Sequence, residues 1–554
     1  MKSCFRQFVN SIILLALGVV AATAAGSAFA AWKIAVRNEL ESGDFARLGL
    51  IFAKTLWSKS IILELSFFLP VLALLLLLRK KINLSGLLFA PLMPALVHFR
   101  YFSDENSLLR MKELAFNSDG LFYWFVFLLT LIAGAIGARG KTRASRAISR
   151  WNLLPVAAVI TSVIIVIVFF LMRSYSQTEK VKLEPAERKV KVFLIGIDGA
   201  TWDVMAPMID SGELPNFASL MRGGSYGTLK TLKPTLSPRI WTSIATGKRP
   251  CKHGIYGFFE FSLPGLSRNI TDIPYRDWKK EQINNGTISK VSSTSTSRRA
   301  AALWNILGAA GRSVGLVRWH TSWPPEEVNG YSITHNAYFS LRREAWDETG
   351  KLPADVTTYP DELISELYPL FTLPSSVPRE EFSNFLPLDN GLWQELQNKK
   401  QYEKGDELSI LKFIYGEDRF FKRAALHMLD KFPTDFFAFY FYGTDAIQHY
   451  FWKYRKPEVF SDVDPEKLKT YGGIIENYYR FADETVGEIM QRADERTVVL
   501  VASDHGMESV RPEGSEGYRS GSHRHAPGGI FIIKGPGIEE RENIEASVLD
   551  IAPT

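Results

Sequence analysis

Carboxylate and imidazole side chains stand beside apolar runs at four places in the second half of the chain. Imidazole nitrogen and carboxylate oxygen are the donors that zinc and similar ions bind in proteins. The residues are Asp198, directly after the run 192–197; Asp445 and His449; Asp504 and His505; and His523 with His525. One Asp at a strand end means little, but four such places supply donors for two divalent metals. The pattern therefore predicts a two-metal hydrolase.

The spacing within each motif limits how its residues could bind. Asp445 and His449 are four residues apart, so on a helix they would share one face and could hold one ion. An ordinary pair on a helix surface is an equally good interpretation of this motif alone. Asp504 and His505 are adjacent, and both could reach a metal only where the backbone turns, which Gly506 permits. A polar strand end is the alternative there.

Two histidines compete for the last ligand position. His525 stands just before Pro527 and an apolar run, so a loop would present it, and His523 is its rival two residues earlier. We expect His525 to be the ligand. For His253 we expect a structural or substrate-facing role.

Ser237 is the candidate nucleophile, just ahead of the helix-like stretch 240–247. A hydroxyl there is ordinarily a helix cap, but free backbone N–H groups at the same place also favour a bound phosphate. Serine is a poor nucleophile unless a base or a metal activates it. No histidine lies near Ser237 in the sequence, so metal activation is the more natural route.

Short apolar runs alternate with helical patterns from residue 190 onward. We expect buried strands of a mostly parallel sheet at 190–197, 435–443, 497–502 and 528–535. Helical spacing occurs at 300–309 and 470–492. Strands alternating with helices predict an α/β sandwich, in which ligands gather at the carboxyl ends of the strands. The candidate aspartates all stand at such ends.

The remaining segments define the domain organisation. Residues 173–189 are polar and suit a linker, and 190–554 would form the catalytic domain. The Ser/Thr/Asn-rich stretch 260–299 predicts an insertion, either a partly ordered lid or a disordered loop. The final residues 549–554 look like the start of a helix, which indicates a truncated C-terminus.

The first third of the chain predicts an all-α membrane region over 1–172. Five apolar spans can be drawn, at 9–31, 60–78, 82–99, 121–138 and 153–172. Basic residues at 79–81 and 139–150 mark cytoplasmic loops, which places the catalytic half on the extracytoplasmic side. A signal peptide is the alternative for the first span and leaves that orientation unchanged. No charged residue lies deep in a span, so transport is unsupported and an anchor in the lipid bilayer is expected.

Composition excludes several classes of protein. With 554 residues the chain is too long for one ordinary domain. Its two cysteines, Cys4 and Cys251, lie far apart, which makes a disulfide framework improbable. The net charge of +6 is modest for this length and does not argue for nucleic-acid binding.

Taken together, the motifs resemble those of the alkaline phosphatase superfamily. The resemblance runs from about residue 190 to the end, in family order, through IGIDGAT, LPNFASL, PTLSPRIWTSIATGKRPCKHGI, YGTDAIQHYFW, SDHGM and HAPGGIFIIKGPGI. Within the superfamily, the chain looks most like the type I phosphodiesterase/nucleotide pyrophosphatase branch. This resemblance implies a three-layer alkaline-phosphatase-like sandwich that cleaves a phosphate ester, such as a nucleotide, a lipid headgroup or another diester.

The resemblance also implies a site with two zinc ions, or manganese as the second choice. One ion would be held by Asp445, His449 and His525, and the other by Asp198, Asp504 and His505, with Ser237 bridging them. Ser237 would attack phosphorus to give a phosphoseryl intermediate, which water then hydrolyses. Arg239 departs from the second proline of related sequences and would either contact a phosphate oxygen or cap the loop.

Three other classes of protein compete with this interpretation. Phosphoethanolamine- and glycerol-phosphate-type headgroup transferases share the architecture, but their motifs differ from SDHGM and GTDxxxH. A sulfatase would need a Cys/Ser-x-Pro-x-Arg motif, which Ser237-Pro238-Arg239 does not match. A scaffold without catalysis is disfavoured because every expected type of ligand is present.

Overall fold

The computed structural model describes two compact units, which are treated separately. The described residues are 31, 34, 44, 47–52, 190–266, 269–271, 273, 276–347, 356–460, 462–511 and 519–554. Apart from residue 31, the expected membrane spans lie outside this set, as does the expected linker. Within the described ranges no helix is both long and apolar enough to cross a bilayer. The first unit includes the described N-terminal residues and Phe259–Ser292, and the second includes the rest of the chain from residue 190.

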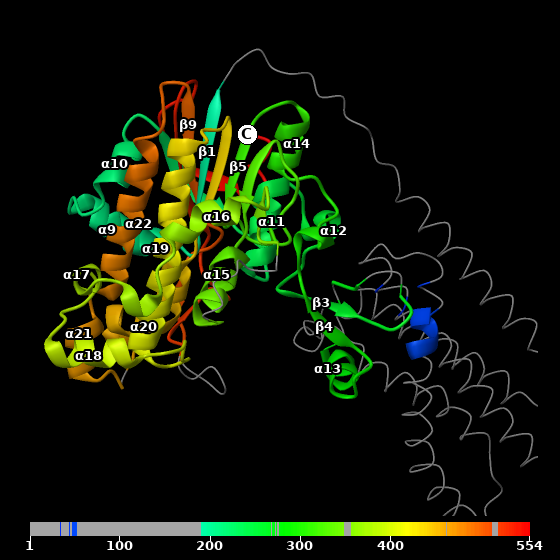
Figure 1. The fold of residues 1–554 in the computed structure, drawn as a ribbon, viewed down its shortest axis with the longest axis horizontal. Coiled ribbons are helices and arrows are strands. Elements are labelled where there is room, and N and C mark those ends of the chain that lie inside the picture. Colours follow the sequence, from blue (N-terminus) through cyan, green and yellow to red (C-terminus); the bar gives the residue numbers. More distant parts are fainter. Residues whose placement is uncertain are drawn as a thin grey trace, which may run out of the picture. The chain divides into compact units, whose positions relative to one another are not determined.

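A nine-stranded sheet forms the centre of the second unit (Figure 1). In spatial order its strands are β13 (Arg541–Ser547), β2 (Ser225–Lys230), β12 (Gly529–Lys534), β9 (Thr497–Ala502), β1 (Lys191–Ile197), β8 (Phe436–Phe441), β5 (Val314–Val317), β6 (Gly330–Ile333) and β7 (Thr358–Tyr359). β1 pairs in parallel with both β8 and β9. The expected mostly parallel sheet is therefore confirmed, with one correction. β12, expected to be parallel, runs antiparallel to β9 and β2.

Both faces of the sheet are buried, which explains the continuous apolar runs of its central strands. Successive side chains of a strand point to opposite faces. On β1, Phe193 and Ile195 join the larger core, whereas Leu194 joins the core on the other face. Helices cover both faces of the sheet (Figure 1).

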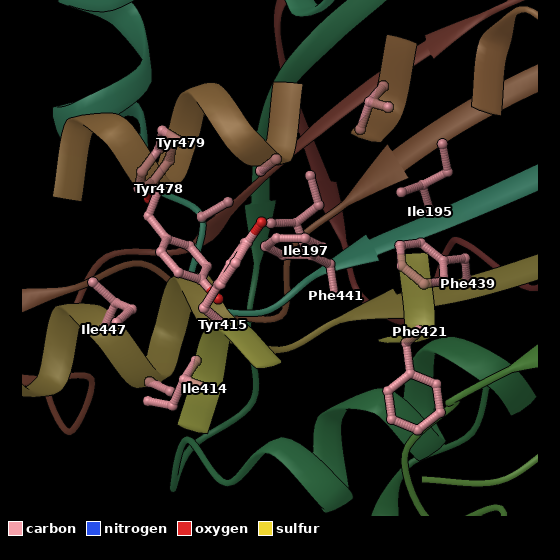
Figure 2. Packing of buried hydrophobic residues seen from close by; sticks show 14 of the residues in the cluster. Ile195, Ile197, Ile414, Tyr415, Phe421, Phe439, Phe441, Ile447, Tyr478 and Tyr479 are labelled. Atoms are coloured by element: carbon pink, nitrogen blue, oxygen red, sulfur yellow. The ribbon is translucent and has the colours of Figure 1, made fainter. Parts of the chain in front are cut away.

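The larger core is rich in aromatic residues (Figure 2). Ile195, Ile197, Phe439 and Phe441 from the sheet contribute to it, and Tyr478 joins them from a covering helix. The helices that contribute to this core are α9 (Trp202–Asp210), α10 (Pro215–Met221), α15 (Asn336–Asp347), α16 (Leu363–Leu367), α17 (Arg379–Ser383), α18 (Asn390–Asn398), α19 (Glu407–Lys431), α20 (Gly443–Arg455), α21 (Pro465–Tyr471) and α22 (Ile474–Met490).

The opposite face carries a smaller core. It is covered by α11 (Ser237–Thr246) and α14 (Leu303–Ala309), whose Trp241 and Trp304 are fully buried. The helical predictions at 300–309 and 470–492 correspond to α14 and α22. The remaining short elements are α12 (Pro250–His253), η1 (Ser295–Ser297), η2 (Tyr368–Leu370), η3 (Pro374–Ser376), η4 (Pro457–Val459) and the strand pair β10 (Glu508–Ser509) and β11 (Gly521–Ser522).

The predicted insertion contains regular structure. Its elements are β3 (Phe259–Ser262), α13 (Arg276–Asn284) and β4 (Ser289–Ser292), with β3 and β4 paired antiparallel. The segment Phe259–Ser292 shares an apolar core with N-terminal residues, in which the ring centroids of Phe52 and Trp278 are 4.4 Å apart. This part of the chain is therefore a folded hairpin and helix, not a structureless loop.

Candidate metal centre

Three parallel strands bring the candidate aspartates together. Asp198 follows β1, and Asp504 follows β9. Asp445 lies in the first turn of α20, which begins two residues after β8 ends. Because β8, β1 and β9 are neighbours and parallel, their carboxyl ends meet at one edge of the sheet. Residues more than 300 positions apart in the sequence thus converge there.

The converging side chains form two groups that could each hold a metal ion. One group is Asp445, His449 and His523, and the other is Asp198, Asp445 and His505. Within each group the ligand atoms lie within 4.8 Å of one another. Asp445 belongs to both groups, so the two candidate sites adjoin.

Two of the imidazoles have their orientation fixed by backbone carbonyls. His449 Nδ1 lies 2.8 Å from the carbonyl oxygen of Gly521, and His505 Nδ1 lies 3.0 Å from that of Gly506. A carbonyl can only accept, so Nδ1 carries a proton in both rings, and Nε2 is the nitrogen left to face the candidate site. Each Nε2 faces carboxylate oxygen. In His449, Nε2 lies 3.3 Å from Asp445 Oδ2. Hydrogen bonds of this kind orient metal-binding histidines.

Asp198 is held by two donors from aromatic side chains. Trp241 Nε1 donates to its Oδ2 at 3.2 Å, and the Tyr440 hydroxyl donates to the same oxygen. Asp198 Oδ1 is left facing His505 Nε2, at 3.4 Å. The two oxygens of Asp198 are therefore divided between the protein scaffold and the candidate site.

Asp504 completes the same region. Its Oδ1 accepts the Gly199 N–H at 3.3 Å, and its Oδ2 lies 3.3 Å from His505 Nε2. Gly199 has φ +68°, and a Cβ there would come within 3.0 Å of Asp445. Glycine thus permits both the left-handed turn after β1 and the close approach of α20.

The donor set fits a divalent cation. Five buried atoms of this cluster have no hydrogen-bond partner in the described part of the chain: Asp198 Oδ1, Asp445 Oδ1, Asp504 Oδ2, His505 Nε2 and His523 Nδ1. Leaving one buried polar group unpaired costs about 1–3 kcal/mol. A cation bound among carboxylate oxygens and imidazole nitrogens would satisfy these atoms together.

The pKa shifts of the three aspartates also favour a bound cation. Burial, together with the negative charges of Asp504 and Asp445, raises the pKa of Asp198 well above its ordinary value. Burial also raises the pKa of Asp504 to about 7. Burial acts to raise the pKa of Asp445, but the combined attraction of His449, His523 and His505 lowers it below its ordinary value. Three carboxyls this close repel one another unless a positive charge lies between them.

His523, and not His525, joins the ligand group. The His523 ring stacks on His505 with centroids 4.0 Å apart and lies 5.1 Å from His449. His525 is exposed, belongs to neither group of candidate ligands, and donates its backbone N–H to Glu508 at 2.5 Å. The geometry therefore favours His523, the rival of His525, as the ligand.

Ser237 is buried at the first residue of α11, where the sequence analysis expected it. It lies one helical turn before Trp241, which bonds Asp198. Just ahead of it, Thr235 Oγ1 donates to the carbonyl of His523 at 2.5 Å. Both attachments tie the start of α11 to the candidate ligands.

Arg239 lies in the first turn of α11, and His253 contacts the same helix through Ser243. The Arg239 guanidinium is 6.0 Å from the ring centroid of Tyr256. Burial and the charge of Arg239 lower the pKa of His253 to about 3. His253 Nδ1 accepts the Ile255 N–H, and Nε2 lies 2.9 Å from Ser243 Oγ, so this histidine is structural.

Tyr440 and Trp241 are site residues that the sequence analysis missed. Both stand in segments that were assigned to a strand and a helix because they are apolar. The available signal was their polar atoms, since a buried Tyr hydroxyl or Trp N–H usually finds a partner. Here both partners are the same carboxylate oxygen of Asp198.

A mostly parallel sheet with adjoining carboxylate and imidazole groups at its carboxyl edge defines an α/β fold with a candidate dinuclear site. The chain belongs to the type I phosphodiesterase / nucleotide pyrophosphatase family, whose model matches residues 192–536. This membership places it in a class of phosphoric ester hydrolases. A comparison with curated proteins gave no match.

The solved structures that match part of this chain include three proteins. Phosphonoacetate hydrolase from Sinorhizobium meliloti 1021 is 15% identical, with 60% of this chain and 59% of that chain covered and a TM-score of 0.31. The murine ectonucleotide pyrophosphatase / phosphodiesterase 5 is 13% identical, with 66% and 93% covered and a TM-score of 0.35. A variant of the alkaline phosphatase PafA is 14% identical, with 67% and 96% covered and a TM-score of 0.40. The matched region thus spans less than two thirds of the phosphonoacetate hydrolase.

Proposed function

We propose that the chain is a membrane-anchored, metal-dependent phosphodiesterase that works through a phosphoseryl intermediate on the extracytoplasmic side. The observation that carries the catalytic part is the pair of ligand groups sharing Asp445, with their buried, unpartnered oxygen and nitrogen atoms. The expected membrane spans and the positive charges between them support the anchor and the orientation.

The residues of each group suit different ligand roles. Asp445, His449 and His523 would hold one ion, and Asp198 and His505 of the second group would hold the other. Asp504, whose Oδ2 lies 3.3 Å from His505 Nε2, would complete that second set, as the resemblance implies. Three of these six donors are imidazoles, which favours zinc or manganese over magnesium. Two bound ions would supply positive charge for the developing alkoxide and for the leaving oxygen.

Ser237 carries the covalent step in this proposal. Its Oγ forms a bond to phosphorus while the bond from phosphorus to the leaving alcohol breaks, and the alcohol takes up a proton. Water then attacks the phosphoserine, which releases the phosphate monoester and restores the serine hydroxyl. Asp198 is kept in place for this step by Tyr440 and Trp241.

The test is hydrolysis of bis-p-nitrophenyl phosphate by the purified full-length chain loaded with zinc. We expect about two zinc ions per chain and a loss of kcat/KM of roughly a thousandfold or more in Ser237→Ala, because no other nucleophile replaces the hydroxyl. Ser237→Thr is the matched control, since it keeps a hydroxyl and should retain much of the activity. Full activity in Ser237→Ala, or a zinc content near zero, would show that this mechanism is wrong.

Product analysis separates hydrolysis from the alternative headgroup transfer. In the presence of glycerol, a phosphodiesterase gives mainly the product of attack by water, whereas a transferase gives mainly the glycerol ester. A dominant glycerol product would reassign the chain to the transferases.

A further inference from the structure

A pair of histidines beside the candidate metal centre has no role in the mechanism above. His320 follows β5, and His335 follows the neighbouring parallel strand β6. Their ring centroids are 6.2 Å apart, with the planes inclined by 30°. Both therefore stand at the edge of the sheet where ligands of α/β proteins bind.

Aromatic contacts connect this pair to the metal centre. The His320 ring lies edge-on to Tyr440, at 5.7 Å between centroids, and the Tyr440 hydroxyl bonds Asp198. On another side, His320 contacts the ring of Phe258 at 5.9 Å, and Phe258 is about half exposed. The histidine thus lies between an inner ring that bonds the candidate ligand Asp198 and an outer ring that faces solvent.

The backbone around His320 is held in an unfavourable conformation. Arg318 and Thr321 have φ of +63° and +57°, in the left-handed region that side chains disfavour, most of all β-branched ones. Thr321 Oγ1 lies 3.1 Å from Thr242 Oγ1 on α11, the helix that begins with Ser237. Such strain costs about 1–3 kcal/mol per residue and is found mostly at functional sites. The contact between Thr321 and Thr242 holds the segment that carries His320 against α11, the helix that begins with Ser237.

Both imidazoles have an unmet hydrogen-bonding requirement. Nδ1 of His320 and Nδ1 of His335 are buried and have no hydrogen-bond partner among the residues that the structure describes. Native proteins rarely leave such atoms unsatisfied, and a ligand or water commonly supplies the partner.

The pair is uncharged near neutral pH. Burial, His335 and the Arg318 guanidinium lower the pKa of His320 to about 3, and burial and Arg318 lower the pKa of His335 to about 4. Arg318 is not available to an anion either, since it is buried in ion pairs with Glu417, at 2.5 Å, and Asp418. Each ring offers one N–H donor and one lone pair, which suits a neutral hydroxyl or amide better than a phosphate or a cation.

We propose that His320 and His335 form a subsite for an uncharged, hydroxyl-bearing ester arm of the phosphodiester substrate. The inference rests on the proposed phosphodiesterase function and narrows its substrate class. A polyol and a nucleoside both offer this chemistry, and the experiment distinguishes them. Headgroups that carry a cation, such as choline, would be poor substrates.

The experiment measures kcat and KM of the full-length, zinc-loaded chain on four p-nitrophenyl phosphodiesters. Their second arms are glycerol, thymidine, choline and a second p-nitrophenyl group. The wild-type chain should have its highest kcat/KM on the glycerol or the thymidine ester, and the better of the two identifies the source. His320→Phe and His335→Phe should raise KM for that ester about five- to tenfold with little change in kcat, because they remove binding that is equal in the ground and transition states. Cleavage of bis-p-nitrophenyl phosphate should stay within about twofold.

Two further variants serve as controls for the subsite. His320→Gln and His335→Gln keep a donor and an acceptor and should restore much of the lost affinity. His427→Phe changes a histidine of α19 that pairs with Glu366 on another part of the unit, and it should leave all four rates unchanged. Zinc content and melting temperature show whether each variant is folded.

The outcomes separate the two proposals. A loss confined to the hydroxyl-bearing esters supports the subsite. Equal losses on all four esters, or no loss on any, would overturn the subsite and leave the phosphodiesterase function standing. A wild-type chain that cleaves none of the esters would overturn the phosphodiesterase function, and the subsite with it.

Discussion

Two of the three candidate ligand imidazoles are oriented by a hydrogen bond from their second nitrogen. His449 and His505 donate Nδ1–H to backbone carbonyls, so Nε2 of each ring already faces carboxylate oxygen and can bind a cation once it is deprotonated. Asp198 is oriented in a similar way. Its Oδ2 accepts hydrogen bonds from Trp241 and Tyr440, and its Oδ1 has no partner among the described residues. Preorganisation of this kind lowers the cost of ordering the ligands when an ion binds.

His523 and His525 provide a matched pair for testing the ligand assignment. His523→Ala should remove close to one zinc ion per chain and lower kcat/KM on bis-p-nitrophenyl phosphate by at least about tenfold, because loss of a ligand leaves Asp445 and His449 alone on one side. His525→Ala should keep both ions and the activity. Zinc analysis together with the kinetics checks both variants, and the reverse result would restore His525 as the ligand.

The spacing of these two histidines explains why the sequence alone could not choose between them. Residues two apart in an extended segment point to the same side, so the pattern could not separate them. The strand pair β10 and β11 decides between them, because β11 ends at Ser522 and its Gly521 carbonyl is bonded to His449. This pairing joins segments that no local pattern connects. By contrast, Asp445 and His449 could be predicted together because helical spacing is local.

At the scale of elements, the first turn of α20 holds the site together. The Gly443 N–H donates to Asp418 at 2.9 Å, and Asp418 also accepts from Tyr478 and pairs with Arg318. Next to it, Thr444 Oγ1 donates to the Asp198 carbonyl at 2.5 Å. The helix that carries Asp445 is thereby attached both to the β1 loop and to a buried ion pair on α19.

Gly443→Ala tests this attachment. A Cβ at position 443 would come within 2.1 Å of Asp418 Oδ2 and 2.3 Å of the Tyr478 hydroxyl, so the start of α20 must shift. We expect a loss of about 1–3 kcal/mol in the free energy of unfolding, as for overpacked cores, together with weaker zinc binding. Denaturant unfolding and zinc titration measure the two effects.

Gly308→Ala on α14 is the control for this prediction. A Cβ there would meet atoms no closer than 3.6 Å, so the better helix propensity of alanine should leave stability unchanged or raise it by about 0.5–1 kcal/mol. If both variants were equally stable and bound zinc equally well, α20 would not depend on the contact with Asp418.

At the scale of the whole molecule, the strands of the sheet could be predicted from the amino-acid sequence, whereas the contacts between distant segments could not. The four predicted strands of the sheet are present because continuous apolar runs reflect burial on both faces. The antiparallel direction of β12 was missed, since periodicity does not encode direction. The shared core of Phe259–Ser292 with N-terminal residues was missed for a related reason, because its apolar residues come from segments far apart in the chain. The membrane spans stay a prediction.

Removal of the metal should reveal the repulsion among the buried carboxyls as a dependence of stability on pH. In the metal-free chain the pKa of Asp504 is about 7 and that of Asp198 is also raised, whereas an unfolded Asp titrates near about 3.9. Between these values the folded state binds more protons than the unfolded state. The stabilising contribution of the protonated groups is therefore present below about pH 4 and is lost as the pH rises through about 7.

The melting temperature of the EDTA-treated chain should thus fall between pH 5 and pH 8, while that of the zinc-loaded chain should hold or rise, because protons compete with zinc for the same atoms. Asp504→Asn is the control, since it removes the titrating carboxyl and should flatten the fall in the metal-free state. Differential scanning fluorimetry across this pH range measures all three samples. If the melting temperature of the metal-free wild type rose toward pH 8 as much as that of Asp504→Asn, these carboxyls would not carry the charge repulsion assigned to them. The case for a cation among them would then lose its electrostatic support.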